Sequence, residues 1–214
     1  MIVVIGSPIG RLESGTAHAA GMASIIALTA AASGRVVQLI GRIGDDPTAD
    51  AVVLDLAAGG VGHVALLRDV SHQTPLEPPT DPPADLDDGT DSDPPEAVDG
   101  LPLEAADADL GLRYLTGFEV LVLTAGQDAA LDAVVVDAAR WAGARLILVL
   151  APDAPPPGDL PPDAIAFEAP SSDPDGAFAT LVGRFAAALD DGVAPGDAFR
   201  ATVEADGWAA AADD

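Results

Sequence analysis

The sequence contains no cysteine, no lysine and no asparagine. Without cysteine, the chain forms no disulfide, offers no thiolate nucleophile and has no cysteine-based metal site. Without lysine, it cannot contain a Walker-type phosphate-binding loop, because that loop depends on its lysine. Every basic residue is therefore an arginine. Nine arginines stand against 35 acidic residues, which gives a formal net charge of −26.

This negative charge limits the classes of partner. Nucleic acid is not an expected partner, because phosphate backbones are bound by clustered cations. A large single-sign charge repels itself in dilute buffer but keeps a protein soluble in concentrated salt. We interpret the charge as adaptation to a salt-rich cytoplasm, as in halophilic archaea. A calcium-binding surface and a disordered acidic protein are the alternatives.

Long hydrophobic runs are also missing. The apolar run Ile2–Ile5 is halted by Gly6 and Pro8 and has no basic leader, so it resembles neither a signal peptide nor a membrane span. We expect a cytoplasmic protein that does not contact membranes. A length of 214 residues suits one domain, residues 1–214, with a substantial core.

Apolar strands alternate with helices along the chain. The predicted strands are Ile2–Ile5, Val36–Ile40, Val64–Leu67, Val120–Leu123, Leu146–Leu150 and Ile165–Phe167. The predicted helices are Thr16–Ala32, Pro47–Ala58, Asp128–Ala142, Pro174–Asp190 and Pro195–Ala212. Because the strands are rich in β-branched residues and lack polar alternation, this pattern predicts an α/β fold. Its sheet is mostly parallel, with helices on both faces.

Two further features are a proline-rich acidic segment and the two tryptophans. Residues 73–102 interleave prolines with aspartates and cannot bury enough apolar surface to offset their ordering entropy, so we predict a flexible acidic, proline-rich loop. Trp141 and Trp208 are expected to pack against the core.

The stretch Gly41–Pro47 is the most informative motif. It follows a predicted strand, turns on two glycines and opens a helix with Asp46 as the N-cap and Pro47 at the first helical position. This stretch resembles the GxIGxDxxG segment of the PfkB (ribokinase-like) carbohydrate kinase family. Ala20-Gly21 is similar to the family's glycine pair, and Asp173–Phe178 is similar to its GAGDAF helix start. The middle of the chain is shorter than in full-length members.

The resemblance implies a reduced ribokinase-like fold. In an active member it would imply phosphoryl transfer from ATP, with Mg²⁺, to a hydroxymethyl group of a sugar or nucleoside. The implied substrate-binding positions are Arg11, Ala20, Gly21, Ser24, Gly41 and Gly44. Arg11 stands where the family has a substrate-binding aspartate. The family's asparagine position falls at Ile25, or at Ser24 with a slip of one residue. The implied anion hole lies at Gly176 and Ala177.

The helix start near Gly176 departs from the family pattern. In these kinases, glycines at this helix start expose N–H groups to the phosphoryl group, and an adjacent aspartate acts as the base. Here Gly176 stands at the base position, and Asp173 and Asp175 stand at glycine positions. A carboxylate about 4 Å from a phosphate oxygen opposes binding by roughly 1–4 kcal/mol.

Asp175 is a candidate for a displaced base, although one helical residue turns a side chain by about 100°. We favour an interpretation in which Asp173 caps the helix, Pro174 begins it and Asp175 complements its dipole.

These departures favour a PfkB-like protein without kinase activity that binds a small metabolite or a protein partner. One alternative is an active ATP-dependent sugar or nucleoside kinase, and only this alternative requires ATP and Mg²⁺. Another is different chemistry, with Arg11 holding an anionic substrate. A homo-oligomer is compatible with the sequence. No metal site is expected, because the three histidines lack carboxylates at ligand spacing.

Overall fold

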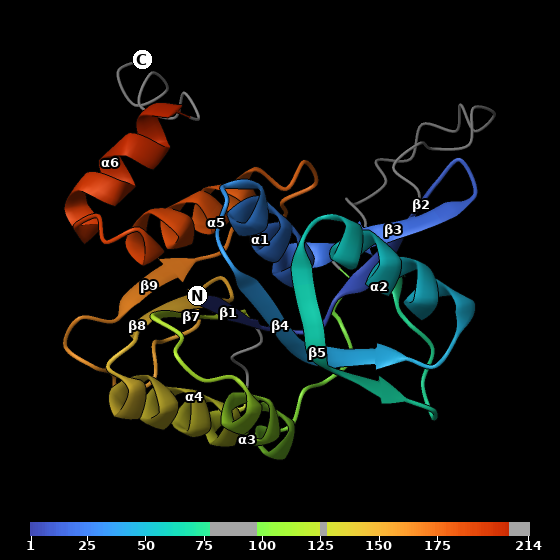
Figure 1. Cartoon of the computed structure of the whole chain (residues 1–214), viewed down its shortest axis with the longest axis horizontal. Coiled ribbons are helices and arrows are strands. Elements are labelled where there is room, and N and C mark those ends of the chain that lie inside the picture. Colours follow the sequence, from blue (N-terminus) through green and yellow to red (C-terminus); the bar gives the residue numbers. More distant parts are fainter. Residues whose placement is uncertain (78–97, 125–127, 206–214) are drawn as a thin grey trace.

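The structure, a computed structural model, describes residues 1–77, 98–124 and 128–205. Its main sheet has six parallel strands in the order β5-β4-β1-β7-β8-β9 (Figure 1). These strands are β1 (Ile2–Ile5), β4 (Val37–Gly44), β5 (Val61–Asp69), β7 (Val120–Leu123), β8 (Arg145–Leu150) and β9 (Ile165–Glu168). The central strand β1 is entirely buried, which explains its uninterrupted apolar sequence.

Helices cover both faces of this sheet (Figure 1). The helices α1 (Gly21–Ala32), α2 (Pro47–Ala58) and α5 (Ala177–Asp190) share one apolar core with the sheet, and α6 (Pro195–Ala205) packs on α5. The helices α3 (Ala105–Tyr114) and α4 (Ala129–Ala142) pack against the opposite face in a second core. The predicted α/β class, with a mostly parallel sheet between helices, is confirmed. Within the described ranges, the helices are all too short or too polar to cross a bilayer.

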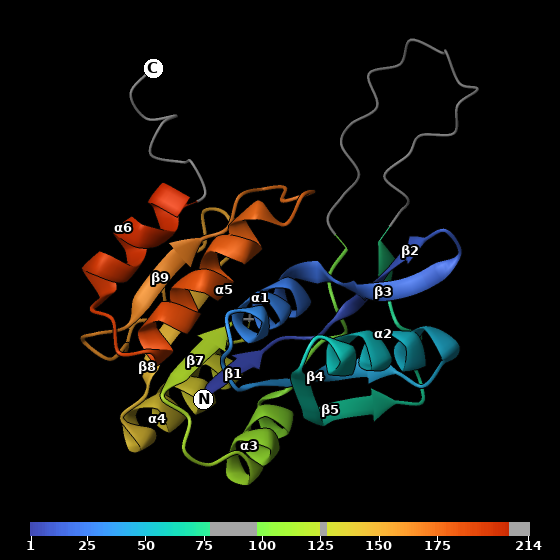
Figure 2. The ribbon, with the colours of Figure 1, turned by 45° about the horizontal axis from the view of Figure 1, so that its top comes forward.

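A second, three-stranded sheet stands beside the body and corrects the predicted helix Thr16–Ala32 (Figure 2). It consists of β2 (Ile9–Glu13), β3 (Thr16–Ala20) and β6 (Leu76–Glu77) in the order β3-β2-β6, and we call it the lid sheet. Residues 16–20 pair with β2 across a turn at Ser14 and Gly15, both with positive φ. The amide of Ala19 also donates to the carboxylate of Asp55 on α2 (2.8 Å). These contacts outweigh the helix propensity of an alanine-rich segment.

Other boundaries differ from the predictions in smaller ways. β4 and β5 are longer than expected, and α3 was not predicted. α5 begins at Ala177 and not at Pro174, because Gly176 has a left-handed φ of +65° that ends helical geometry. β6 lies within the segment expected to be loop, of which residues 78–97 fall outside the described residues.

The tryptophan on α4 is exposed to solvent. Trp141 is 92% exposed on the last turn of α4 and does not pack against the core as expected. Trp208 lies outside the described residues, as does the part of the predicted helix Pro195–Ala212 beyond Ala205.

At the junction between β4 and α2, the predicted N-cap Asp46 and first helical residue Pro47 are confirmed, but the predicted glycine turn is wrong, because β4 continues through Gly41 to Gly44. The junction also fixes the chain leading to β6. The carboxylate of Asp46 accepts hydrogen bonds from the amide of Ala49 (2.7 Å) and from the amide (2.6 Å) and hydroxyl (3.0 Å) of Thr74. The Thr74 hydroxyl in turn accepts from the amide of Gly44 (3.2 Å). Burial by itself raises the pKa of Asp46, but these hydrogen bonds outweigh it and hold the pKa below its ordinary value.

Candidate functional site

The glycines of the motif lie at the carboxyl end of β4, and each is required by a close backbone contact. A Cβ on Gly41 would lie 2.5 Å from the carbonyl oxygen of Gly6, at the carboxyl end of β1. A Cβ on Gly44 would lie 2.5 Å from the amide nitrogen of Thr74. The next amide, that of Arg42, donates to the hydroxyl of Ser7 (2.9 Å). The glycines therefore hold the β1–β2 connection and the segment before β6 against β4.

The other small residues of the predicted substrate site lie at the start of α1. Gly21 has a φ of +81°, and a Cβ there would lie 2.9 Å from the side chain of Ile9. Ala20 is buried beside it. Ser24 is fully buried, and its hydroxyl has no hydrogen-bond partner among the described residues. The structure thus brings these positions together at the base of the lid sheet.

Arg11 lies on the lid sheet and is committed to an ion pair. It stands directly opposite Glu77 in the β2–β6 register, and its Nε donates to the Glu77 carboxylate (2.5 Å). This hydrogen bond raises the pKa of Arg11 above its ordinary value, and the charges of Glu13 and Asp175 act in the same direction. Arg11 is therefore bonded to one carboxylate and lies within electrostatic range of two others, one of which belongs to the loop before α5.

The amino terminus of α5 is capped by a side chain of the same chain. The two carboxylate oxygens of Asp173 accept hydrogen bonds from the amides of Phe178 and Ala179, each at 3.0 Å. Its carbonyl oxygen accepts from the amide of Gly176 (3.1 Å). The capping role predicted for Asp173 is confirmed, and the carboxylate lies where these amides would otherwise meet an anion.

Gly176 and Ile25 are in direct contact. A Cβ on Gly176 would lie 2.8 Å from Cδ1 of Ile25, so the side chain of Ile25 fills the space that a residue larger than glycine would need. Ala177, the first residue of α5, is exposed, and so is Asp175.

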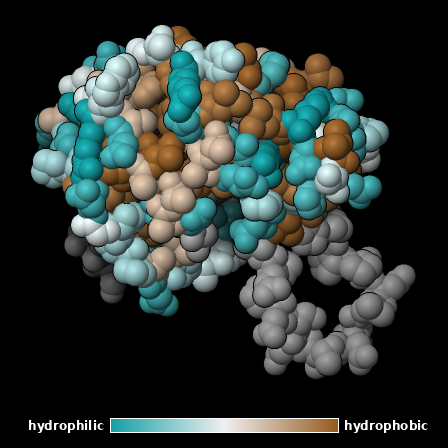
Figure 3. All heavy atoms as spheres, turned by 90° about the horizontal axis from the view of Figure 1, so that it is seen from below, coloured by the Kyte–Doolittle hydropathy of each residue, from teal (hydrophilic) through white to brown (hydrophobic). Residues whose placement is uncertain are grey.

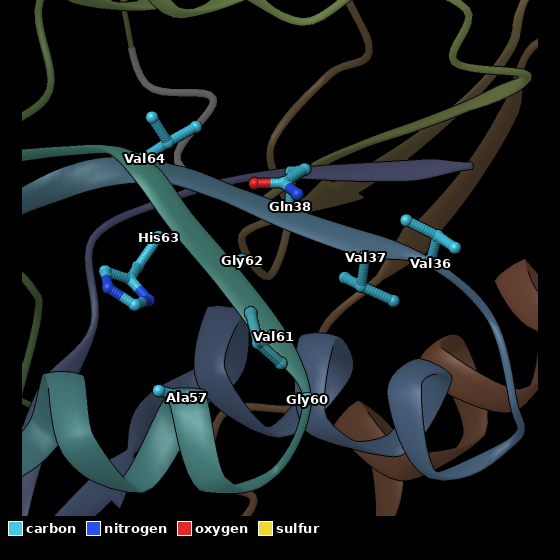
Figure 4. A pocket seen from close by; sticks show the side chains of 9 residues that line it. All are labelled: Val36, Val37, Gln38, Ala57, Gly60, Val61, Gly62, His63 and Val64. Carbon is cyan, nitrogen blue, oxygen red and sulfur yellow. The ribbon is translucent and has the colours of Figure 1, made fainter.

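A shallow hollow on the surface lies away from these residues (Figure 4). It is formed by the first residues of β4 and β5 and the end of α2, including Val37, Ala57 and His63. Gly41 and Gly44 are at the other end of β4, so the hollow does not belong to the predicted substrate site.

Comparison with known proteins finds similarity in structure only: no family model matches the sequence, and no curated protein matches it. An Arabidopsis thaliana ribokinase solved with ribose and ATP matches with a TM-score of 0.64 and 16% identity, over 96% of this chain and 90% of that chain. A putative ribokinase II from E. coli, solved with ATP and Mg²⁺, matches with a TM-score of 0.65 and 11% identity, over 94% and 89%. A PfkB protein from Polaromonas sp. JS666 matches with a TM-score of 0.62 and 15% identity, over 94% and 92%.

The fold is ribokinase-like, as in the PfkB sugar kinases. The resemblance predicted from the sequence is thus confirmed at the level of the fold, in a chain of only 214 residues.

The residues of this ribokinase-like site do not fit ATP and Mg²⁺. Two amides in the first turn of α5, those of Phe178 and Ala179, already donate to the Asp173 carboxylate, and the amide of Gly176 donates to the carbonyl oxygen of Asp173. Arg11 is paired with Glu77. In the described part of the chain, histidine and acidic side chains form no group of three or more placed to bind a metal ion. We therefore derive no step through a bound nucleotide.

Sequence reasoning missed two contacts of the ribokinase-like site. Glu77 is 66 residues from Arg11 and lies in a segment that reads as loop, so no local signal marks it as a partner. The contact between Ile25 and Gly176 joins α1 to the start of α5. The sequence did contain a signal for the contact between Ile25 and Gly176, because the apolar Ile25 stands at the family's asparagine position.

Proposed function

We propose that this chain is a ribokinase-like protein without phosphoryl-transfer activity that binds a small uncharged metabolite or a protein partner. The observation that carries this proposal is the hydrogen bonding of both Asp173 oxygens to the amides of Phe178 and Ala179. Helix amino termini bind phosphate through free N–H groups and a positive dipole end. Here the Asp173 carboxylate accepts hydrogen bonds from two of these N–H groups and neutralises the positive end of the dipole.

The position of the general base supports the same proposal. Gly176 has no side chain with which to accept a proton, and its φ of +65° strains any replacement other than glycine. Ile25 occupies the adjacent space. Restoring a carboxylate at this position would require at least a second change to make room for it.

Electrostatics also disfavour an anionic ligand. Two arginines stand at or next to the predicted substrate positions, and both are paired. Arg11 bonds Glu77, with the charges of Glu13 and Asp175 also acting on it, and Arg42 bonds Asp107 (2.8 Å). Each carboxylate near a phosphate raises the free energy of binding. An uncharged ligand, or a protein surface without excess negative charge, avoids this cost.

Thermal unfolding in concentrated KCl tests the proposal. A ligand present at 100 times its dissociation constant stabilises the native state by about 2.7 kcal/mol, which shifts the unfolding midpoint measurably. We expect no shift of the wild-type protein with ATP and Mg²⁺, and no transfer of the γ-phosphoryl group to any sugar or nucleoside tested. Saturable stabilisation by ATP together with phosphorylated product would overturn the proposal.

Two variants sharpen this test. Asp173→Ala frees the amides of α5, while Asp128→Ala removes the matched cap of α4, where Asp128 accepts from the amide of Ala130 (2.9 Å). Each substitution is expected to destabilise the protein by about 0.5–2 kcal/mol. Only in the Asp173→Ala variant should ATP or inorganic phosphate raise the thermal unfolding midpoint. An equal response of the two variants would contradict the special role of Asp173.

An active ATP-dependent sugar or nucleoside kinase is the second candidate. It is favoured by Asp175, an exposed carboxylate next to the start of α5 that lies within electrostatic reach of Arg11. Under this alternative, Asp175 would accept the proton of a substrate hydroxyl, and ATP with Mg²⁺ would supply the phosphoryl group. Asp175→Asn would then abolish a measurable transfer activity without abolishing nucleotide binding. The proposal above expects no activity to abolish.

A further inference from the structure

Strand β5 is an edge of the main sheet, and its outer side has no strand beside it in the described chain. β5 pairs with β4 alone, and Figures 1 and 2 show it at the margin of the sheet. A strand directs about half of its N–H and C=O groups away from a single neighbouring strand. Among the described residues, one backbone group of β5 bonds to a segment other than β4: the carbonyl of Asp69 accepts from the amide of His72. The remaining outward groups are therefore available to a further strand.

β5 lacks most of the features that protect an edge strand. Natural edges are short, or carry proline or charged side chains, so that other chains do not pair with them. β5 has nine residues, and Val61–Leu67 contain no proline, arginine or acidic residue. The opposite edge strand, β9, has four residues and ends in Glu168. A register shift after Gln38 disturbs the amino half of β5, but Ala65–Asp69 pair regularly with β4.

Carboxylates lie beside the carboxyl half of β5 on the α2 side of the sheet. Arg68 of β5 bonds Asp50 of α2 (2.6 Å) and lies 3.5 Å from Asp45. The side chains of Asp50 and Asp45 are 67% and 52% exposed. Two carboxylates thus share one guanidinium group, and this side of the edge carries excess negative charge.

The α3 side of the same half carries a larger excess. Arg42 of β4 bonds Asp107 (2.8 Å) and lies 3.5 Å from Glu104 and 3.9 Å from Asp69. His72 also bonds Asp69 (2.9 Å), so three carboxylates share one arginine and one histidine. Figure 3, which looks from the α3 and α4 side, shows hydrophilic residues (teal) interspersed with apolar ones (brown) on this side. Carboxylates therefore outnumber cations on both sides of the edge.

We infer that β5 is where an extended, basic segment of a partner protein adds as a further strand of the main sheet. An extended strand is the structure that satisfies a row of outward backbone groups. The carboxylates set its charge: side chains of an added strand alternate between the two faces, so arginine or lysine on either face would lie near a carboxylate.

The same charges argue against a second copy of this chain at β5. Pairing two β5 edges would bring the two sets of carboxylates toward each other, and like charges across an interface oppose binding. The inference concerns a surface other than the ribokinase-like site. It does not depend on whether the chain transfers a phosphoryl group.

A fluorescein-labelled peptide that alternates arginine with valine tests the inference by fluorescence anisotropy. The control is the same peptide N-methylated at every residue, which keeps the charge but has no N–H donors. The KCl concentration is the lowest at which the protein is folded, because salt screens the attraction. We expect saturable binding of one peptide per chain, and a dissociation constant roughly tenfold or more higher for the methylated peptide. Equal binding of the two peptides would show general attraction to a chain of charge −26 and would overturn the inference.

Two double variants locate the peptide. Asp45→Asn with Asp50→Asn leaves the β5 arginine unpaired and should raise the dissociation constant of the arginine–valine peptide by roughly fivefold or more. Asp137→Asn with Asp159→Asn is the matched control, because these residues lie 3.8 and 2.9 Å from one arginine, Arg140 of α4, and their loss changes the net charge equally. The control should leave the dissociation constant within a factor of about two. Equal weakening by both double variants would contradict binding at β5.

Hydrogen exchange of the wild-type protein provides a second measurement that needs no substitution. Outward amides of β5 should exchange freely in the protein alone and slow down when the arginine–valine peptide is added. Bound peptide without slower exchange in β5 would place it elsewhere and overturn the inference. So would a dimer of the protein alone with these amides already protected, because a second copy would then occupy the edge.

Discussion

Cδ1 of Ile25 lies 2.8 Å from the position that a Cβ on Gly176 would occupy. The contact joins α1 to the start of α5, at the place where the resemblance to PfkB kinases puts the general base. Two independent features therefore restrict this position to glycine: the left-handed backbone and the side chain of Ile25.

Alanine substitutions at Gly176 and Gly143 separate the effect of the left-handed backbone from the effect of the contact with Ile25. Gly143 has a φ of +66° with no atom within 4 Å of a Cβ, whereas Gly176 has a φ of +65° and the contact with Ile25. We expect Gly176→Ala to lower the free energy of unfolding by about 1–3 kcal/mol more than Gly143→Ala, the usual range for overpacking. Denaturant unfolding in concentrated KCl measures both.

Ile25→Val provides the control for that comparison, because it deletes Cδ1 and leaves the rest of the side chain. In the Ile25→Val background, Gly176→Ala should cost nearly the same as Gly143→Ala. If the excess cost persists in this background, Ile25 is not its cause.

Protonation of Asp190 is expected to reduce the stability of the folded protein at low pH. Its buried carboxylate accepts hydrogen bonds from the amino group of Met1 (2.7 Å) and from Nε of Arg35 (2.7 Å). Burial raises the pKa of Asp190, but these hydrogen bonds and charges outweigh it, so the pKa in the folded protein lies below its ordinary value. The resulting stabilisation is complete above the unfolded pKa of about 3.9 and is lost as the pH falls through the folded pKa.

Asp190→Asn should therefore cost about 1.5–3 kcal/mol at neutral pH and weaken the loss of stability below about pH 4. Asp191→Asn is the matched control: Asp191 also bonds Arg35 (2.7 Å), but its side chain is 67% exposed. Exposed pairs contribute about 0–1 kcal/mol. Equal effects of the two substitutions on unfolding curves recorded from pH 3 to pH 7 would contradict the assignment.

Thr74 links the lid sheet to the body. Thr74→Val removes the hydroxyl that accepts from the amide of Gly44 and donates to Asp46, and leaves that amide unsatisfied. We expect a loss of about 1–3 kcal/mol in the free energy of unfolding. Thr202 is equally buried, and among the described residues its hydroxyl donates to the carbonyl of Ala198 within α6, so Thr202→Val leaves no amide unsatisfied there and should cost much less. A larger loss for Thr202→Val would be the contrary result.

The part of the fold that the sequence predicted is the part encoded by local signals. Asp46, Pro47 and Gly59 mark both ends of α2, and its boundaries were predicted correctly. The capping role of Asp173 was also predicted, because an acid and a proline before an apolar helix are a local pattern. The pairing of Arg11 with Glu77 was not, since it depends on strands 66 residues apart.

The wrong predictions, for residues 16–20 and for Trp141, concern features that depend on contacts between distant parts of the chain. Residues 16–20 have helix propensity but are held as β3 by the hairpin and by Asp55, which are tertiary contacts. Trp141 has the size of a core residue, yet it lies on the outer side of α4, where the described chain places no neighbour to cover it.

Salt should stabilise the protein. Repulsion within a chain of net charge −26 is screened as the Debye length falls from about 10 Å at 0.1 M salt to about 3 Å at 1 M. Exposed ion pairs such as Arg68 with Asp50 (2.6 Å) weaken under the same conditions, but each contributes at most about 1 kcal/mol. We expect the thermal unfolding midpoint to rise with KCl concentration. A midpoint that falls as KCl is added would show that ion pairs outweigh repulsion.

The most direct test of the central claim is an NMR titration that follows the amide signals of Phe178 and Ala179. In concentrated KCl, these signals are expected to stay unchanged as ATP and Mg²⁺ or inorganic phosphate are added, because both amides already donate to Asp173. Saturable shifts of both signals in the wild-type protein would show that the start of α5 receives an anion, and would contradict the account.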